Sequence, residues 1–464
     1  MTAEHILFLT GKLAEPALRK VVGQLSEQVG FGFEIEEVGV SVAALMHVDL
    51  VLRRLTLRES YDRVLVPGWC LGELERLTEH FGIRFERGPK DLFDLPEVFG
   101  RGRRPPVPLD DYDIDILAEI NHAPRLDDAA IIRLAQHFRD SGADLIDLGC
   151  IPGERWGRVG EVTRLLVDQG FRVSIDSFER LEVEDAVAAG AELVLSCNST
   201  NIDWAEQLDV EFVVIPDAPF GLDSLAVTIE RLQRAGRRFR IDPIIEPIGF
   251  GFAASLARYF EARRRWPELE IMMGVGNLTE LTEVDTAGMN FLLAALCQEI
   301  GIRSVLTTEV INWARSAVRE FDIARRQTFY AINHRALPKH IDPRLAMLRD
   351  PRVNELGDET LRLLASQIKD PNYRIFVERG ELHVMNRDGY WHGTDPFALF
   401  DQFKAAASEA LADGHAFYLG HELCKAATAL KLGKQYMQDE ALRWGFLTTE
   451  EDSAIKRRHE RTRD

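Results

Sequence analysis

The sequence is poor in cysteine and has no long apolar run. Its five cysteines are scattered over 464 residues without a CxxC pair, which favours reduced core thiols over a disulfide framework or a zinc site. No stretch approaches the roughly 20 apolar residues that span a bilayer, so we expect no membrane segment. The N-terminus also lacks a basic region ahead of an apolar one. These features predict a cytoplasmic protein.

Basic charge is scarce as well. The 56 Lys and Arg residues are outnumbered by 75 Asp and Glu residues, which gives a formal net charge of -19. Such a field repels a phosphate backbone, so we expect no nucleic-acid partner. Nucleotide-binding loops are missing too. Thr10, Gly11 and Lys12 follow the first expected strand but fit neither GxxxxGK[ST] nor GxGxxG, and we interpret them as a plain turn.

The sequence does contain an apolar, strand-like run followed by a helical stretch, repeated eight times. The runs cover residues 113–121, 143–149, 171–176, 192–198, 210–217, 239–242, 270–277 and 303–307. Each is too short and too apolar to be an amphipathic helix. Apolar residues at helical spacing lie between them, as in residues 127–141, 179–190, 224–235 and 286–301. Eight such units predict a (β/α)8 TIM barrel with its active site at the C-terminal strand ends.

The segments on either side predict two further domains. A charged, proline-rich stretch at 101–111 separates an N-terminal domain, residues 1–104, from the barrel, residues 112–340. Strands at 6–10, 33–38 and 63–66 alternate with helices and predict a doubly wound α/β domain of the flavodoxin-like or Rossmann-like type. Beyond residue 345, a small α+β domain over 345–464 is expected from strands at 373–377, 381–386 and 416–419 and helices at 395–413 and 422–431.

Four barrel strands end in a polar side chain: Asp176, Asn198, Asp242 and Asn277. Two carboxylates and two carboxamides without a lysine are costly to leave unpaired, so the ring predicts a ligand rich in hydrogen-bond donors and acceptors. A pterin fits. Its 2-amino group and N3–H present adjacent donors to a carboxylate, while its ring nitrogens and O4 suit carboxamides. The alternative for each residue taken singly is that it caps the following helix.

These motifs resemble, over residues 112 to about 335, the pterin-binding barrel of dihydropteroate synthases and of pterin-dependent corrinoid methyltransferases. The resemblance is carried by Ile120 and Asn121, GADLIDLG at 142–149, SIDS at 174–177, Asn198, and Asp242 and Pro243 followed by GFGF at 249–252. It implies that Asp176, Asn198 and Asp242 hold the pterin ring. It also implies that Asn121 faces a diphosphate-bound magnesium ion and that Asn277 contacts the ring, as in the methyltransferases.

The sequence departs from the synthases in two places. Their Ser-Arg-Lys after the seventh strand and Arg-x-His at the eighth are replaced by NLTE at 277–280 and TTE at 307–309. The ordinary folate enzyme is therefore not expected, and an anionic group would be met by other basic residues. We name Arg155, Arg315, Arg319 and Lys339 as candidates. Glu119 and His122 are expected to support the site or cap a helix, without an acid-base role.

The three-part layout resembles dihydropteroate synthase-related proteins of archaea and methylotrophic bacteria that make tetrahydromethanopterin. It implies a magnesium-assisted transferase that joins a hydroxymethyl-dihydropterin diphosphate to an arylamine, ribofuranosylaminobenzene phosphate. Two other functions stay open: a methyltransferase-type barrel acting with a corrinoid partner, and a noncatalytic pterin-binding protein. Barrels of this kind often pair through outer helices, so we expect a homodimer. His415, His421 and Glu422 are candidate metal ligands, although structural roles fit their spacing better.

Overall fold

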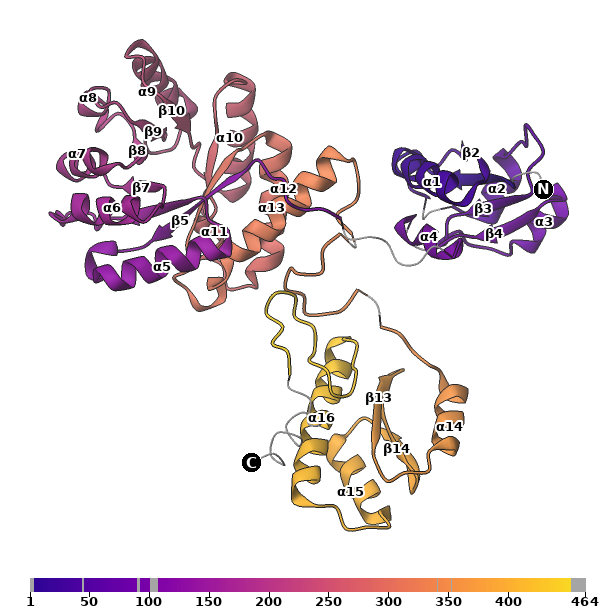
Figure 1. Ribbon diagram of the computed structural model, residues 1–464. Coiled ribbons are helices and arrows are strands. Elements are labelled where there is room, and N and C mark those ends of the chain that lie inside the picture. Colours follow the sequence, from indigo (N-terminus) through magenta and orange to yellow (C-terminus); the bar gives the residue numbers. More distant parts are fainter. Residues whose placement is uncertain are drawn as a thin grey trace. The chain divides into compact units, whose positions relative to one another are not determined.

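A computed structural model describes residues 4–43, 46–89, 92–100, 107–339, 341–351 and 353–451. The chain divides into two compact units, residues 1–112 with 326–341 and residues 113–325 with 342–464. Figure 1 shows the helices and strands along the chain. Part of the expected linker at 101–111 lies outside the described residues. Among the helices of the described segments, none has the length and apolar character needed to cross a membrane.

The first unit is built on a parallel four-stranded sheet in the order β2-β1-β3-β4. Its strands are β1 (His5–Thr10), β2 (Gly32–Glu37), β3 (Arg63–Val66) and β4 (Arg84–Arg87). Alternate residues of β1 face opposite sides of the sheet, so Ile6 and Phe8 pack on one side and Leu7 and Leu9 on the other. The first side is covered by α1 (Glu15–Val29) and α4 (Leu95–Val98), the second by α2 (Val48–Arg54) and α3 (Glu75–Phe81). The expected strands were found, but β4 was missed because its sequence, RFER, has a single apolar residue.

Eight parallel strands of the second unit form the barrel. They are β5 (Asp115–Ile120), β6 (Leu145–Gly149), β7 (Val173–Asp176), β8 (Leu193–Cys197), β9 (Glu211–Val214), β10 (Phe239–Ile241), β11 (Met272–Gly274) and β12 (Ser304–Thr307). Their order is β10-β9-β8-β7-β6-β5-β12-β11, and a parallel bridge from Ile241 to Ile271 joins the two ends. Each of the eight expected runs contains one of these strands, so the predicted α/β barrel is confirmed.

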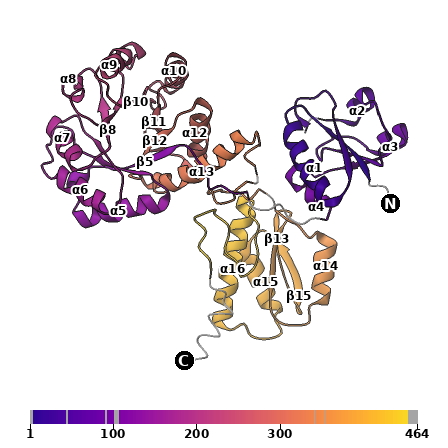
Figure 2. The same cartoon turned by 45° about the horizontal axis from the view of Figure 1, so that its top comes forward.

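Helices surround the strands of the barrel (Figure 2). They are α5 (Asp128–Ser141), α6 (Val159–Asp168), α7 (Arg180–Ala189), α8 (Ile202–Ala205), α9 (Leu222–Arg234), α10 (Phe252–Arg265), α11 (Gly276–Thr279), α12 (Thr286–Ile300) and α13 (Ala317–Asn333). The expected capping chemistry is visible in α5, where Asp127 accepts a hydrogen bond from the amide of Ala130 at 2.7 Å and Gly142 ends the helix with φ 107°.

The two-residue period of the strands decides which side chains enter the barrel. Leu117, Leu145 and Leu193 pack together inside it, while their neighbours Ile116 and Ile146 belong to the core beneath the helices. Two residues after Leu117 and Leu145, the next side chains that point inward are the acidic Glu119 on β5 and Asp147 on β6. The barrel interior is therefore apolar in its lower layer and acidic toward the C-terminal strand ends.

Residues 342–451 have a core of their own around an antiparallel sheet in the order β13-β14-β15. The strands are β13 (Arg374–Glu378), β14 (Glu381–Asn386) and β15 (Gly389–Gly393), and the helices are α14 (Asp358–Gln367), α15 (Pro396–Ala406) and α16 (Asp413–Leu432). The strand expected at 416–419 is wrong, because those residues lie within α16. The buried residues Leu419, Leu423 and Ala426 recur at helical spacing, a signal that four residues are too few to reveal.

Candidate active site in the barrel

Carboxylates from three neighbouring strands gather in the upper part of the barrel. Glu119 of β5 is the register partner of Asp147 of β6, so the two side chains point to the same side of the sheet. Asp176 of β7 is paired with Gly149, two residues further along β6. Burial, followed by the negative charge of Asp176, raises the pKa values of both Glu119 and Asp147. The site is thus a shared acidic centre.

Gly149 provides the space that Glu119 occupies. A Cβ atom at Gly149 would lie 2.5 Å from Oε1 of Glu119 and 3.2 Å from the carbonyl oxygen of Ile120. Burial, and then the charges of Asp176 and Glu280, raise the pKa of Glu119 to about 7. A carboxyl group with such a pKa exchanges its proton near neutral pH, so Glu119 has the properties of a general acid or base.

Asp147 is fully buried beside Glu119. The hydroxyl of Ser174 donates to its Oδ1 at 2.6 Å, whereas Oδ2 has no hydrogen-bond partner among the described residues. Burial, followed by the charges of Asp176 and Glu119, raises the pKa of Asp147 well above its usual value. A buried carboxylate oxygen without a partner is costly. Asp147 therefore needs a proton, a hard cation or a donor supplied by a ligand.

Asp242 lies directly after β10 and is 4% exposed. Its Oδ1 accepts hydrogen bonds from the hydroxyl of Tyr259 at 2.5 Å and from the amide of Ile244 at 2.7 Å. Ile244 has φ 65°, an unfavourable conformation for a β-branched residue, so the carboxylate holds a strained turn in place. Burial raises the pKa of Asp242 to about 6, although these donors lower it.

Asp176 ends β7 and is only partly exposed. Burial raises its pKa to about 6. At neutral pH, Asp176 and Asp242 are therefore mostly ionised acceptors, while Asp147 is the group that favours a proton. The barrel separates carboxyl groups of one chemical type into different protonation states, which is a feature of sites that bind or transfer protons.

The two predicted carboxamides each organise a loop. Oδ1 of Asn198 accepts from the amide and the hydroxyl of Thr200 at 2.9 and 2.6 Å. Nδ2 of Asn277, on α11, donates to the carbonyl oxygen of Ile245 at 2.8 Å. Neither contact caps the following helix, which was the alternative considered for single residues, because the N-cap residues are Asn201 for α8 and Val275 for α11. In the described part of the chain, no hydrogen bond is found for Nδ2 of Asn198 or Oδ1 of Asn277.

Asn121 and the three predicted arginines follow barrel strands at their C-terminal ends, whereas Lys339 does not. Asn121 follows β5 directly and is half-buried. Arg155 follows β6, 3.9 Å from Asp185, and Arg315 follows β12, where its Nη1 donates to Asn312 at 3.3 Å. Arg319 begins the first turn of α13 and is 4.0 Å from Asp322. Lys339 belongs to the first unit.

Acidic residues stand where the synthases carry their basic groups, and here they fasten loops. Glu280 accepts from the amides of Val310 and Ile311 at 3.0 and 2.9 Å. Glu309 accepts from the amide of Val318 at 3.1 Å and contacts His137 at 2.9 Å. Glu280 and Glu309 are thus structural carboxylates, and both follow barrel strands at their C-terminal ends.

Sequence reasoning overlooked part of this centre. Glu119 was expected only in a supporting role, and Asp147 was given none. The two-residue period from Leu117 to Glu119 and from Leu145 to Asp147 was the signal that both point inward. Nothing in the sequence indicated Tyr259, since it reaches Asp242 from α10.

Tyr259 offers a test of how the structure tunes Asp242. In a Tyr259→Phe variant, Asp242 loses a donor that lowers its pKa, so that pKa should rise above about 6. A raised carboxyl pKa costs stability only where the unfolded state has lost its proton. We therefore expect a loss of about 1 kcal/mol or more at pH 8, shrinking at pH 4. Urea unfolding at both pH values measures it, and an equal loss at both would contradict the assignment.

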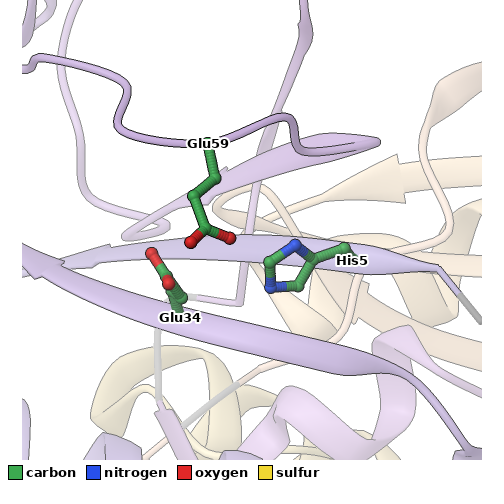
Figure 3. A group of neighbouring side chains, drawn as sticks. All are labelled: His5, Glu34 and Glu59. Carbon is green, nitrogen blue, oxygen red and sulfur yellow. The ribbon is translucent and has the colours of Figure 1, made fainter.

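Two other groups of side chains have the composition of metal ligands. His5, Glu34 and Glu59, in the first unit, offer ligand atoms within 4.8 Å of one another (Figure 3). The hydroxyl of Tyr61 already donates to Glu34, and its ring lies 5.1 Å from that of His5. This local network accounts for the cluster without an ion.

The second group is His421, Glu422 and Glu451 on and near α16. Here Nζ of Lys425 lies 2.8 Å from Glu422 and 2.7 Å from Glu451, so an ammonium group already supplies the positive charge. His415 is not part of the group and instead packs against Tyr373, with ring centroids 5.9 Å apart. These contacts favour the structural roles expected for His415, His421 and Glu422.

Comparison with known proteins gives matches of two kinds. Residues 4–90 match a family of unknown function, DUF6513. The uncharacterized protein MJ0107 of Methanocaldococcus jannaschii is 26% identical over 94% of this chain and 98% of its own length. The relationship therefore extends over all three parts of the chain, including the barrel.

Among solved structures, the chain is similar to dihydropteroate synthases. That of Coxiella burnetii, in complex with pteroic acid, is 17% identical over 47% of this chain and 93% of its own, with a TM-score of 0.36. That of Yersinia pestis is 18% identical over 48% and 94%, with a TM-score of 0.39. That of Thermus thermophilus is 20% identical over 49% and 96%, with a TM-score of 0.37.

Proposed function

We propose that the barrel binds a pterin and acts as a transferase of the dihydropteroate synthase type. The observation that carries the proposal is the placement of two carboxylates, the half-buried Asp176 and the buried Asp242, at the C-terminal ends of β7 and β10. An ionised carboxylate pairs with the two adjacent donors of an aminopyrimidine edge. The open amide atoms of Asn198 and Asn277 supply the donor and the acceptor for the rest of the ring.

The reaction follows from this binding mode. A hydroxymethyl-dihydropterin diphosphate would lose diphosphate as its methylene C–O bond breaks, and the arylamine nitrogen would form the new C–N bond. The nitrogen must then release a proton. Glu119, with a pKa of about 7, is suited to accept it. This role goes beyond the supporting one expected from the sequence.

The site also suits a magnesium ion. Magnesium prefers hard oxygen ligands. The side chain of Asn121 offers an amide oxygen directly after β5, and Asp147 on the neighbouring strand β6 has an unpartnered Oδ2 among the described residues. Bound there, the ion would offset the negative charge of the diphosphate, which the acidic mouth otherwise repels. Arg155, Arg315 and Arg319 would meet the outer phosphate.

The second substrate is proposed from the resemblance of the three-part chain to proteins of tetrahydromethanopterin biosynthesis. It would be ribofuranosylaminobenzene phosphate rather than p-aminobenzoate. The acidic loop residues Glu280 and Glu309 favour two alternatives, a methyltransferase-type barrel acting with a corrinoid partner and a noncatalytic pterin-binding protein. Three outcomes distinguish these functions. Release of diphosphate indicates the transferase, methyl transfer to cobalamin indicates the methyltransferase, and binding of pterin without turnover indicates the noncatalytic protein.

Two asparagine variants separate metal binding from ring binding. Asn121→Ala should reduce magnesium-dependent diphosphate release about tenfold or more while pterin binding changes little. Asn277→Ala should weaken binding of pterin whether or not magnesium is present. Diphosphate release and calorimetric titration measure the two effects. If Asn121→Ala leaves turnover unaltered, or the wild-type protein releases no diphosphate with any arylamine, the transferase proposal fails.

A further inference from the structure

The first unit contains a cavity of about 440 Å³ beside its sheet. It lies at the C-terminal ends of the central strands. Its walls include Thr10 at the end of β1 and Leu13 after it, Val66 at the end of β3 and Trp69 after it, and Pro89 after β4. This volume is within the range of small-molecule sites in proteins.

The position of the cavity follows from the order of the strands. In the order β2-β1-β3-β4, the chain moves outward in one direction from β1 to β2 and in the other from β3 to β4. The loops after β1 and β3 therefore diverge and leave a crevice between them. Open α/β sheets bind ligands in the crevice at such a switch point.

The loop after β1 does not offer a cradle for a phosphate. Its amides are used within the protein, because Lys12 donates to the carbonyl oxygen of Val40 at 2.9 Å and Leu13 to that of Ser41 at 3.0 Å. The amide of Ala14 donates to Gly11 at 3.0 Å. A nucleotide bound through its phosphates is thereby disfavoured, in agreement with the plain turn expected here.

The lining instead suits a flat apolar body. Leu13, Val42 and Trp69 all line the cavity and are 72%, 43% and 48% exposed, so large apolar surfaces face an open volume. An indole ring provides a rigid stacking surface. The charged side chains that line the cavity in the described part of the chain are cationic, Arg335 and Lys339, and belong to the same unit.

We propose that this cavity is a second small-molecule site, separate from the barrel, that binds a flat aromatic molecule carrying an anionic group. The aromatic body would lie against Trp69 and between the apolar side chains after β1 and β3. The anionic group would lie toward Arg335 and Lys339. The inference is independent of the function proposed for the barrel.

The test uses the full chain and the aromatic sulfonate 8-anilinonaphthalene-1-sulfonate as the probe. We expect saturable enhancement of the probe's fluorescence with one site per chain. Because Trp69 would transfer excitation energy to the bound probe, the emission on tryptophan excitation should be reduced in Trp69→Phe. Ala17→Phe, on the cavity wall of α1, should weaken binding about tenfold or more. Gln24→Phe, on an exposed position of the same helix, should change it less than about twofold.

Charge is tested with the neutral probe N-phenyl-1-naphthylamine and with Lys339→Ala. The neutral probe should bind several-fold more weakly than the sulfonate, and Lys339→Ala should reduce the sulfonate to the same level. If circular dichroism shows Ala17→Phe to be unfolded, Trp69→Ala takes its place with the same expected loss. The proposed site is contradicted if the sulfonate binds Ala17→Phe, or its replacement Trp69→Ala, as tightly as wild type. It is also contradicted if Gln24→Phe loses as much affinity as the cavity variant. Equal affinity for both probes overturns its anionic specificity.

Discussion

Replacing Asp242 with asparagine is expected to weaken binding of a pterin by about 30-fold or more, which corresponds to roughly 2 kcal/mol. The fold should survive, because an asparagine Oδ1 still accepts from Tyr259 and Ile244. The second oxygen, however, becomes a donor and opposes the amino-pyrimidine edge of the ligand. Calorimetric titration of wild-type and variant protein with the same dihydropterin measures the loss.

Asp176→Asn should act in the same direction, since its carboxylate is the second proposed acceptor. The matched control is Asp209→Asn, at a side chain that is 95% exposed, which should leave the titration unchanged. Binding should also weaken in the wild-type protein as the pH falls through about 6, where Asp176 and Asp242 take up protons. Titrations that are the same for both site variants and the control would remove the pterin proposal.

The second large effect concerns the cost of burying Glu119. Its pKa is raised from 4.5 to about 7 in the folded protein, so the folded state keeps a proton that the unfolded state loses between these values. The resulting stability is present in full below about pH 4.5 and is lost as the pH rises to about 7. Glu119→Gln removes this dependence, so its stability relative to wild type should rise by up to about 3 kcal/mol from pH 4 to pH 8.

Urea unfolding of both proteins at the two pH values measures this difference. Any loss from a poorer fit of glutamine is the same at both pH values and cancels in the comparison. Glu161→Gln is the control, because the Glu161 side chain is 73% exposed on α6. It should show nearly the same pH dependence as wild type. If Glu119→Gln also follows the wild-type curve, Glu119 has an ordinary pKa and the proton-accepting role falls.

The barrel was predictable because its strands repeat a strong pattern. Each buried parallel strand reads as a short apolar run, and glycines such as Gly142 and Gly190 end the helices between them. Asp176 and Asp242 were predictable as well, since strand ends mark the active face of such a barrel. Two short strands outside the barrel were missed because they lack an apolar run. β4 is largely charged, and β15 (GYWHG) was missed between the expected elements of the last domain.

The interior of the site was harder to predict, because its chemistry depends on packing across strands. Burial, in the space that Gly149 leaves, and then the charge of Asp176 raise the pKa of Glu119. Tyr259 lies on α10, 17 residues after Asp242 in the chain. The partner of Asn277 is the carbonyl oxygen of Ile245, 32 residues earlier in the chain, whose position no local spacing rule provides. These contacts appear only when the chain is folded.

The most direct test of the central claim is a calorimetric titration of the wild-type protein with a hydroxymethyl-dihydropterin diphosphate, with and without magnesium, at pH 7.5. We predict saturable binding of one pterin per barrel, strengthened by magnesium, and diphosphate release when an arylamine is added. An absence of saturable binding under both conditions, in protein shown to be folded, would contradict the claim that this barrel is a pterin site.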